Sequence, residues 1–112
     1  MSGSATNLNA NAIALLRGAQ QLIDEPNRWT QAVMARDQFG EPVSPRSVDA
    51  RCFCIIGALE AVAPSCRISL EGELQKDLPK GAQYVPVFND SCGHADVMAL
   101  FDRTVARLES AR

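Results

Sequence analysis

The segment from Val48 to Ala63 constrains the fold most, because it is apolar around nearly the whole circumference of a helix. It carries only three charged residues. Ser47 before it and Pro64 after it are typical of a helix start and a helix end. A helix that is apolar on most sides is buried at the centre of a domain. We therefore predict a central buried helix over residues 48–63.

Small side chains line one face of this predicted helix. At 100° per residue, Ala50, Cys54, Gly57, Ala58 and Ala61 fall into one stripe. Such a stripe allows the backbone of another segment to approach the helix closely.

The rest of the chain alternates helical and extended patterns around this segment. We predict an α+β fold, with about three helices packed on a small antiparallel sheet that consists of a hairpin plus one edge strand. A chain of 112 residues is long enough for one domain. We expect residues 1–7 to be a flexible N-terminus and residues 8–110 to be a single globular domain. The predicted elements are a helix from about Leu8 to Asp24, a strand from Trp29 to Arg36 with a turn at Asp37–Gly40 and a return through Val43, a weaker helix from Leu70 to Leu78, an edge strand from Tyr84 to Phe88, and a helix from Gly93 to Ser110 capped by Asp90 or Ser91.

Charge and hydropathy argue against several classes of partner. The chain has 11 Lys and Arg against 13 Asp and Glu, a net charge of −2, and its basic residues do not cluster. Binding to nucleic acid or to an anionic membrane needs a basic face, so we expect neither partner. The N-terminus has no pattern of a signal peptide, so we expect a cytoplasmic protein with free thiols. We expect no cofactor, since the sequence has no glycine-rich phosphate loop or nucleotide fingerprint.

Several short motifs follow one another along the chain in a characteristic order and spacing. They are Arg28-Trp29-Thr30-Gln31, Ala35-Arg36-Asp37 with Gly40 and Val43, Cys54-x-x-Gly57-Ala58-Leu59, Asn89-Asp90 and His94-x-x-Val97. Together they resemble a family of small uncharacterised bacterial and phage proteins that is classed as a domain of unknown function. The likeness spans Leu15 to Leu108, with Phe53 and Phe88 where members of the family carry Trp. The resemblance supports the fold and implies no activity.

One set of residues has the types found in cysteine-nucleophile enzymes. His94 is the only histidine, and Cys54 with Asn89 or Asp90 would complete such a site. A catalytic cysteine usually lies at a helix N-terminus, where the helix dipole lowers its pKa. We place Cys54 about two turns inside the predicted helix, which favours an inert buried thiol. We expect His94 to hydrogen-bond a buried backbone carbonyl.

Two other constellations have competing interpretations. Cys52 and Cys54 with Cys92 and His94 are zinc-type ligands, but residues two apart on a helix diverge by about 200°, so we expect no metal site. Trp29 with Arg28 and Asn89 could contact a ligand or a partner, or Trp29 could fill the core.

These observations favour a small non-catalytic interaction protein that self-associates or binds another protein. A homo-oligomer and a heterologous protein partner both stay open. The alternative is a cysteine-dependent hydrolase or transferase that uses Cys54, His94 and Asp90, and a further alternative is a small-molecule binder with a pocket near Trp29, Asn89 and His94.

Overall fold

Five α-helices and one two-stranded antiparallel sheet make up the part of the chain that is described. The structure is a computed structural model that describes the backbone of residues 2–111 and the side chains of residues 9–111. The predicted α+β class is confirmed. In chain order the elements are α1 (Ser2–Leu22), the 3-10 turn η1 (Pro26–Arg28), β1 (Ala35–Arg36), β2 (Cys52–Phe53), α2 (Ile55–Val62), the 3-10 turn η2 (Pro64–Cys66), α3 (Arg67–Gln75), α4 (Val85–Ser91) and α5 (His94–Ser110).

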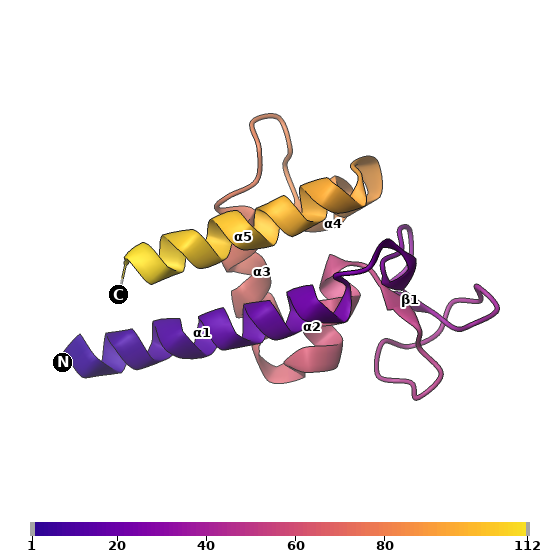
Figure 1. Ribbon diagram of the computed structural model, residues 1–112, viewed down its shortest axis with the longest axis horizontal. Helices are drawn as coiled ribbons and strands as arrows, with labels where there is room; N and C mark the ends of the chain where they lie inside the picture. Colours follow the sequence, from indigo (N-terminus) through magenta and orange to yellow (C-terminus); the bar gives the residue numbers. More distant parts are fainter. Residues whose placement is uncertain (1, 112) are drawn as a thin grey trace.

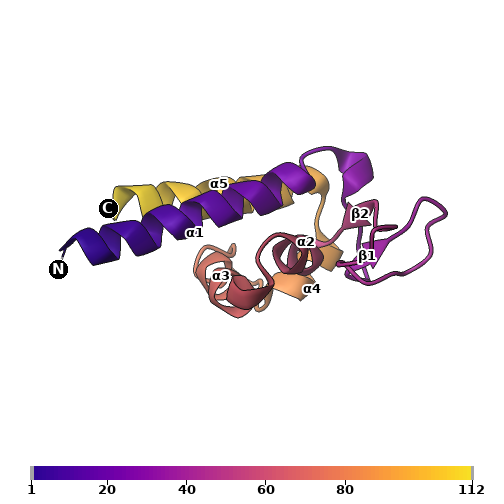
Figure 2. The ribbon, with the colours of Figure 1, turned by 90° about the horizontal axis from the view of Figure 1, so that it is seen from below.

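The helices lie in two layers. The long helices α1 and α5 run antiparallel and side by side, so that the two ends of the chain lie near each other (Figure 1). The shorter helices α2, α3 and α4 form a second layer against this pair, and the small sheet lies at one end of the molecule (Figure 2). The second layer therefore presents its outer face, including α4, away from the long helices.

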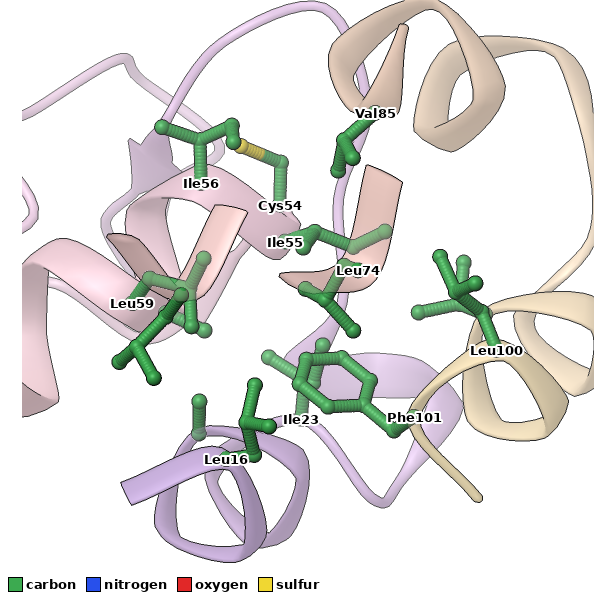
Figure 3. Packing of buried hydrophobic residues seen from close by; sticks show 14 of the residues in the cluster. Leu16, Ile23, Cys54, Ile55, Ile56, Leu59, Leu74, Val85, Leu100 and Phe101 are labelled. Atoms are coloured by element: carbon green, nitrogen blue, oxygen red, sulfur yellow. The ribbon is translucent and has the colours of Figure 1, made fainter. Parts of the chain in front are cut away.

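The core lies between the two layers. Phe101 of α5 packs among Leu16 of α1, Ile23 directly after α1, and the side chains of α2 and α3 (Figure 3). Phe101, Leu16 and Ile23 are completely buried, as are Ile55 and Leu59 of α2. Burial of a side chain of this size contributes about 1.5–3 kcal/mol. All residues from Ile55 to Leu59 are buried, which confirms the central buried helix.

The central helix is shorter than predicted. It begins at Ile55 with Cys54 as its N-cap, and not after Ser47. Residues 52–53 belong instead to β2, where Cys52 pairs with Arg36 and Phe53 with Ala35. The boundary was wrong because it depends on a strand partner that is distant in sequence, which the helical periodicity of the segment does not reveal.

The predicted strand from Trp29 to Arg36 is wrong over most of its length. Only Ala35–Arg36 forms β1, and Trp29 makes a single isolated bridge to Phe53. Between them Ala32 has a positive φ of 74°, so the chain cannot continue as a regular strand. A fixed, strongly bent loop therefore lies where an extended strand was expected.

The turn at Asp37–Gly40 is confirmed. The Asp37 carboxylate accepts hydrogen bonds from the backbone of Phe39 and Glu41, and Gly40 adopts a φ of 82°, which glycine tolerates best. The return strand is reduced to a bridge between Pro42 and Arg36 and one hydrogen bond from Val43 to Ala35.

The predicted edge strand Tyr84–Phe88 is also wrong, because this segment forms helix α4. Pro86 lies in the first turn of the helix, where backbone N–H groups have no intrahelical acceptor. The missing N–H of proline therefore costs no hydrogen bond there. Val85 and Phe88, three residues apart, face the core. The apolar residues thus have helical spacing, although the β-branched residues of this segment favour a strand.

The remaining helices differ from the predictions only in their limits. Helix α5 begins at His94 with Gly93 as its N-cap, in place of Asp90 or Ser91. Helix α3 spans residues 67–75 instead of 70–78, and α1 spans residues 2–22 instead of 8–24. The predicted flexibility of residues 1–7 stays a prediction, since their side chains lie outside the described residues.

Candidate functional site

A buried asparagine on α4 fixes the geometry of the region that the sequence motifs mark. Asn89 is completely buried. Its Oδ1 accepts hydrogen bonds from Trp29 Nε1 at 2.8 Å and from the Ile55 backbone N–H at 3.0 Å. Its Nδ2 donates to the Thr30 carbonyl at 3.1 Å and to Asp90 Oδ1 at 3.0 Å. One side chain thereby joins α4, the start of α2 and the loop after η1.

Gln31 and Arg36 hold the same loop from its other side. Gln31 Nε2 donates to the backbone carbonyls of Asn89 and Cys92 at 3.0 and 3.1 Å. The Arg36 guanidinium donates to Thr30 Oγ1 at 2.9 Å and to the carbonyls of Gly40 and Gln31. Most of the polar residues that carry the family resemblance are therefore engaged in shaping the backbone of residues 29–40.

Cys54 occupies a helix N-terminus, contrary to the prediction that placed it two turns inside a helix. Its backbone N–H donates to the Met34 carbonyl at 3.1 Å, and its Sγ accepts from the Gly57 N–H at 3.3 Å. Burial raises the pKa of the Cys54 thiol, the Gly57 and Ile56 amides lower it, and the Asp90 carboxylate raises it. The desolvation outweighs the helix terminus, so the group stays a neutral thiol at pH 7.

His94 does not join Cys54. Its Nε2 lies 2.7 Å from the carbonyl oxygen of Ile23, as expected for a histidine bonded to a backbone carbonyl. Its ring packs edge-on against Trp29, with 5.9 Å between the centroids. Since Ile23 directly follows α1, this contact joins the start of α5 to the end of α1. Nothing in this arrangement supports a cysteine–histidine pair.

The two remaining contact candidates have different environments. Trp29 is half-buried, with its indole N–H bonded to Asn89, whereas Arg28 is exposed on η1. Trp29 and Asn89 use their polar side-chain atoms inside the protein. Contact of Trp29, Arg28 and Asn89 with a ligand or a partner stays a prediction.

A pocket opens where the loop, α2 and α4 meet. Its volume is about 210 Å³, and Cys54 and Asp90 are on its wall. The other lining residues are mainly apolar: Ala32, Val33, Met34, Ile56, Pro86 and Asn89. In Figure 3, Cys54 and Ile56 lie at the edge of the core cluster farthest from Phe101. The pocket thus lies where the core meets the surface.

Sequence reasoning identified Cys54, Asn89 and Asp90 but missed the apolar lining of the pocket. Val33 and Met34 were assigned to a strand, and Pro86 to an edge strand. The signal for Pro86 was available, since Val85, Phe88 and Asn89 have the spacing of one helix face. The role of Val33 and Met34 depends on the bend at Ala32, which has no local signature.

Two general site types have no support in the part of the chain described. Among residues 9–111, no three His, Cys, Asp or Glu side chains come together as metal ligands would. None of the helices within residues 2–111 combines the length and the apolarity that a membrane crossing demands.

Comparison with known proteins gives one match. No curated protein and no solved structure matches the chain. Residues 8–107 match a family described as "Family of unknown function (DUF6197)", which agrees with the resemblance seen in the sequence motifs. Because this match covers most of the 112 residues, the chain belongs to the DUF6197 family.

Proposed function

We propose that this protein is a non-catalytic interaction protein that binds a protein partner through the solvent face of α4. The observation that carries the proposal is the exposure of two large apolar side chains there. Tyr84, the N-cap residue, is 60% exposed and Val87 is 58% exposed. Tyr84 directly precedes α4 and Val87 lies in its first turn, so the two exposed side chains are at the same end of this helix. Apolar surface with polar surroundings is typical of protein interaction sites.

The pocket extends this surface. Pro86 and Asp90 of α4 line the pocket, and both residues are exposed on the same helix as Val87. At 100° per residue, Asp90 lies between Pro86 and Val87 around the helix axis. The apolar face therefore continues into a concave site, a combination that suits an anchoring side chain of a partner.

Charge favours a heterologous partner over a second copy of this chain. Helix α4 contains one aspartate, Asp90, and no Lys or Arg. A symmetric contact between two copies through α4 would bring the two Asp90 carboxylates near each other, which is unfavourable. A partner with a basic, partly apolar segment would be complementary.

Exposed large apolar side chains also lie on α3, at Ile68 (75% exposed), and in the loops between β1 and β2, which form the main competing surface. Phe39 is 79% exposed and Val48 is 91% exposed. Both lie in irregular loops, whose ordering on binding costs more entropy than the use of a preformed helix. This difference favours α4.

Quantitative affinity capture from the cells that express the protein tests the proposal. The bait would be the full chain, a Tyr84→Ser/Val87→Ser variant and a Phe39→Ser control, each shown to be folded by circular dichroism. We expect a partner that the chain and the Phe39→Ser control capture equally and that the double variant loses. Sedimentation velocity of the full chain should show a monomer.

Three results would contradict the proposal. They are a partner lost only with Phe39→Ser, capture that is unaffected by the double variant, and a dimer that the double variant dissociates. The last result would establish self-association through α4.

A further inference from the structure

We infer that the pocket beside α4 receives a lysine side chain of the partner, with the lysine ammonium on Asp90. This inference rests on the proposed function and specifies the chemistry of its partner. It follows from three features of the pocket: its apolar wall, the orientation of its carboxylate and the state of its thiol.

The wall of the pocket suits an alkyl chain. Val33, Met34, Ile56 and Pro86 provide apolar surface, and the volume of about 210 Å³ is much larger than the roughly 10–15 Å³ that one water molecule needs. Lysine buries its four methylene groups along apolar surface and keeps its ammonium at a polar edge. An exposed carboxylate at the pocket rim is the group that such an ammonium would reach.

Asp90 is held in one orientation, and within the described side chains, those of residues 9–111, only its Oδ1 accepts hydrogen bonds. Its Oδ1 accepts from the Ala32 N–H at 2.9 Å and from Asn89 Nδ2 at 3.0 Å. Among residues 9–111, no Lys, Arg or His forms an ion pair with this carboxylate. The positive φ of Ala32 directs its N–H at Oδ1, so the loop itself fixes the carboxylate. The second oxygen, Oδ2, is thus preorganised for a cation.

One available oxygen favours lysine over arginine. Arginine binds a carboxylate best through two parallel hydrogen bonds, which require both oxygens. The ammonium of lysine is a compact point charge that needs only one. Since Oδ1 is already occupied by two donors, the geometry points to a primary ammonium.

Cys54 does not compete for this role. Its thiol is neutral and its Sγ is engaged by the Gly57 N–H, so the pocket carries the single negative charge of Asp90. A neutral, polarizable sulfur adds to the apolar wall.

Chemical-shift titration of the ¹⁵N-labelled full chain with n-butylammonium tests the inference. n-Butylammonium reproduces the end of a lysine side chain, 1-butanol is the uncharged control, and n-butylguanidinium represents arginine, all at constant ionic strength. We expect n-butylammonium to shift the amide signals of Ala32, Val33, Met34, Ile56 and Asp90. It should bind about fivefold more tightly than 1-butanol, the effect of a partly exposed ion pair, and more tightly than n-butylguanidinium.

Two variants with the same change of charge locate the effect. Asp90→Asn keeps a carbonyl oxygen for the Ala32 and Asn89 donors and removes the charge, so it should lower the affinity for n-butylammonium about fivefold. Asp49→Asn alters an exposed carboxylate in the loop between β1 and β2 and should leave the affinity unchanged. Equal affinity for n-butylammonium and 1-butanol, or unchanged affinity in Asp90→Asn, would overturn the inference. If Asp90→Asn does not fold, the comparison of the three ligands on the unaltered protein decides.

The outcome is separate from that of the capture experiment. A partner that depends on Tyr84 and Val87, together with a pocket that does not distinguish n-butylammonium from 1-butanol, would retain the proposed function and refute the lysine site. Loss of the proposed function would require the capture results described above.

Discussion

Replacement of Gly57 by alanine tests the packing of the loop against α2. A Cβ atom at Gly57 would lie 1.9 Å from the backbone oxygen of Met34, whereas real Cβ contacts essentially never fall below 3.0 Å. The loop would have to retreat by about 1 Å. The Met34 oxygen is also the acceptor for the Cys54 N–H, so retreat weakens the bond that joins the loop to the start of the helix.

The expected loss of stability combines two destabilising effects and one stabilising effect. Overpacking costs about 1–3 kcal/mol, and a buried donor left without its acceptor costs about 1–3 kcal/mol. The helix propensity of alanine offsets about 1 kcal/mol. We therefore expect Gly57→Ala to lower the free energy of unfolding by about 3 kcal/mol. At about 4 °C per kcal/mol, the melting temperature would fall by about 12 °C.

Urea denaturation and calorimetry would measure this loss, with Gly72→Ala as the matched control. Gly72 also lies in a helix, and a Cβ there would meet nothing within 4 Å. Gly72→Ala should therefore be stabilising by about 0.5–1 kcal/mol. If Gly57→Ala were as stable as the parent protein or gained as much as Gly72→Ala, the close approach of the loop to α2 would be refuted.

Three further predictions concern Asn89, Cys54 and Cys92. Asn89→Ala should lower the free energy of unfolding by about 3–5 kcal/mol, because the Trp29 and Ile55 donors lose their shared acceptor, and it should change the fluorescence of Trp29. A loss below about 1 kcal/mol in urea denaturation would show that Asn89 does not hold these segments together. Cys54→Ser should be nearly neutral, since serine is a favoured N-cap residue, whereas Cys54→Ala should cost about 1 kcal/mol; the reverse order of melting temperatures would refute the capping role. Burial and the nearby Asp96 raise the pKa of the Cys92 thiol to about 11, so its alkylation by iodoacetamide in the native protein should accelerate only near pH 11; acceleration near pH 9 would show that the thiol is not desolvated. The same pKa shift makes the free energy of unfolding depend on pH. As the pH rises, the thiol of the unfolded chain ionises before that of the folded protein, so the stabilisation by Cys92 is complete below about pH 9 and declines towards pH 11.

The prediction for Cys54 depends on its place at the start of α2. In the interior of a helix, a serine at this position would bury an unsatisfied hydroxyl and cost more than alanine. At the N-cap, the hydroxyl replaces Sγ as the acceptor for the Gly57 N–H. The difference comes entirely from the helix start, which the structure places at Ile55.

Elements with strong local signals could be predicted from the sequence. Helix α5 has a regular apolar stripe, and the turn at Asp37–Gly40 has residues that its geometry requires. The buried character of α2 was predictable because almost no charge interrupts its apolar residues. The close backbone contact expected at the small-residue stripe is present at Gly57, where the approaching atom is the Met34 oxygen.

Elements that depend on distant partners could not be predicted. The β2–α2 boundary is set by pairing of residues 52–53 with residues 35–36. Helix α4 contains β-branched residues and a proline that favour an edge strand, and it becomes a helix because Val85, Phe88 and Asn89 are buried together. The bend at Ala32 is stabilised by Asp90, from a segment nearly 60 residues away.

The candidate site, too, could be predicted from the sequence only in part. The sequence identified Cys54, Asn89 and Asp90 by residue type, but the types alone suggested catalysis or ligand contact. The structure assigns Asn89 to the interior, gives Cys54 a capping role and leaves Asp90 with an available oxygen. Roles of this kind follow from hydrogen-bond partners, and these partners come from three separate segments: the loop after η1, the start of α2 and α4.

Site-specific photo-crosslinking in the native cells tests the central proposal most directly. A benzophenone amino acid at Val87 would report what touches the solvent face of α4, and the same group at Ala14, which is exposed on α1 in the other layer, is the control. The proposal predicts one specific adduct from Val87 to a different protein, attached through a lysine-containing segment, and no such adduct from Ala14. Adducts from Val87 only to a second copy of this chain, or the same products from both positions, would contradict it.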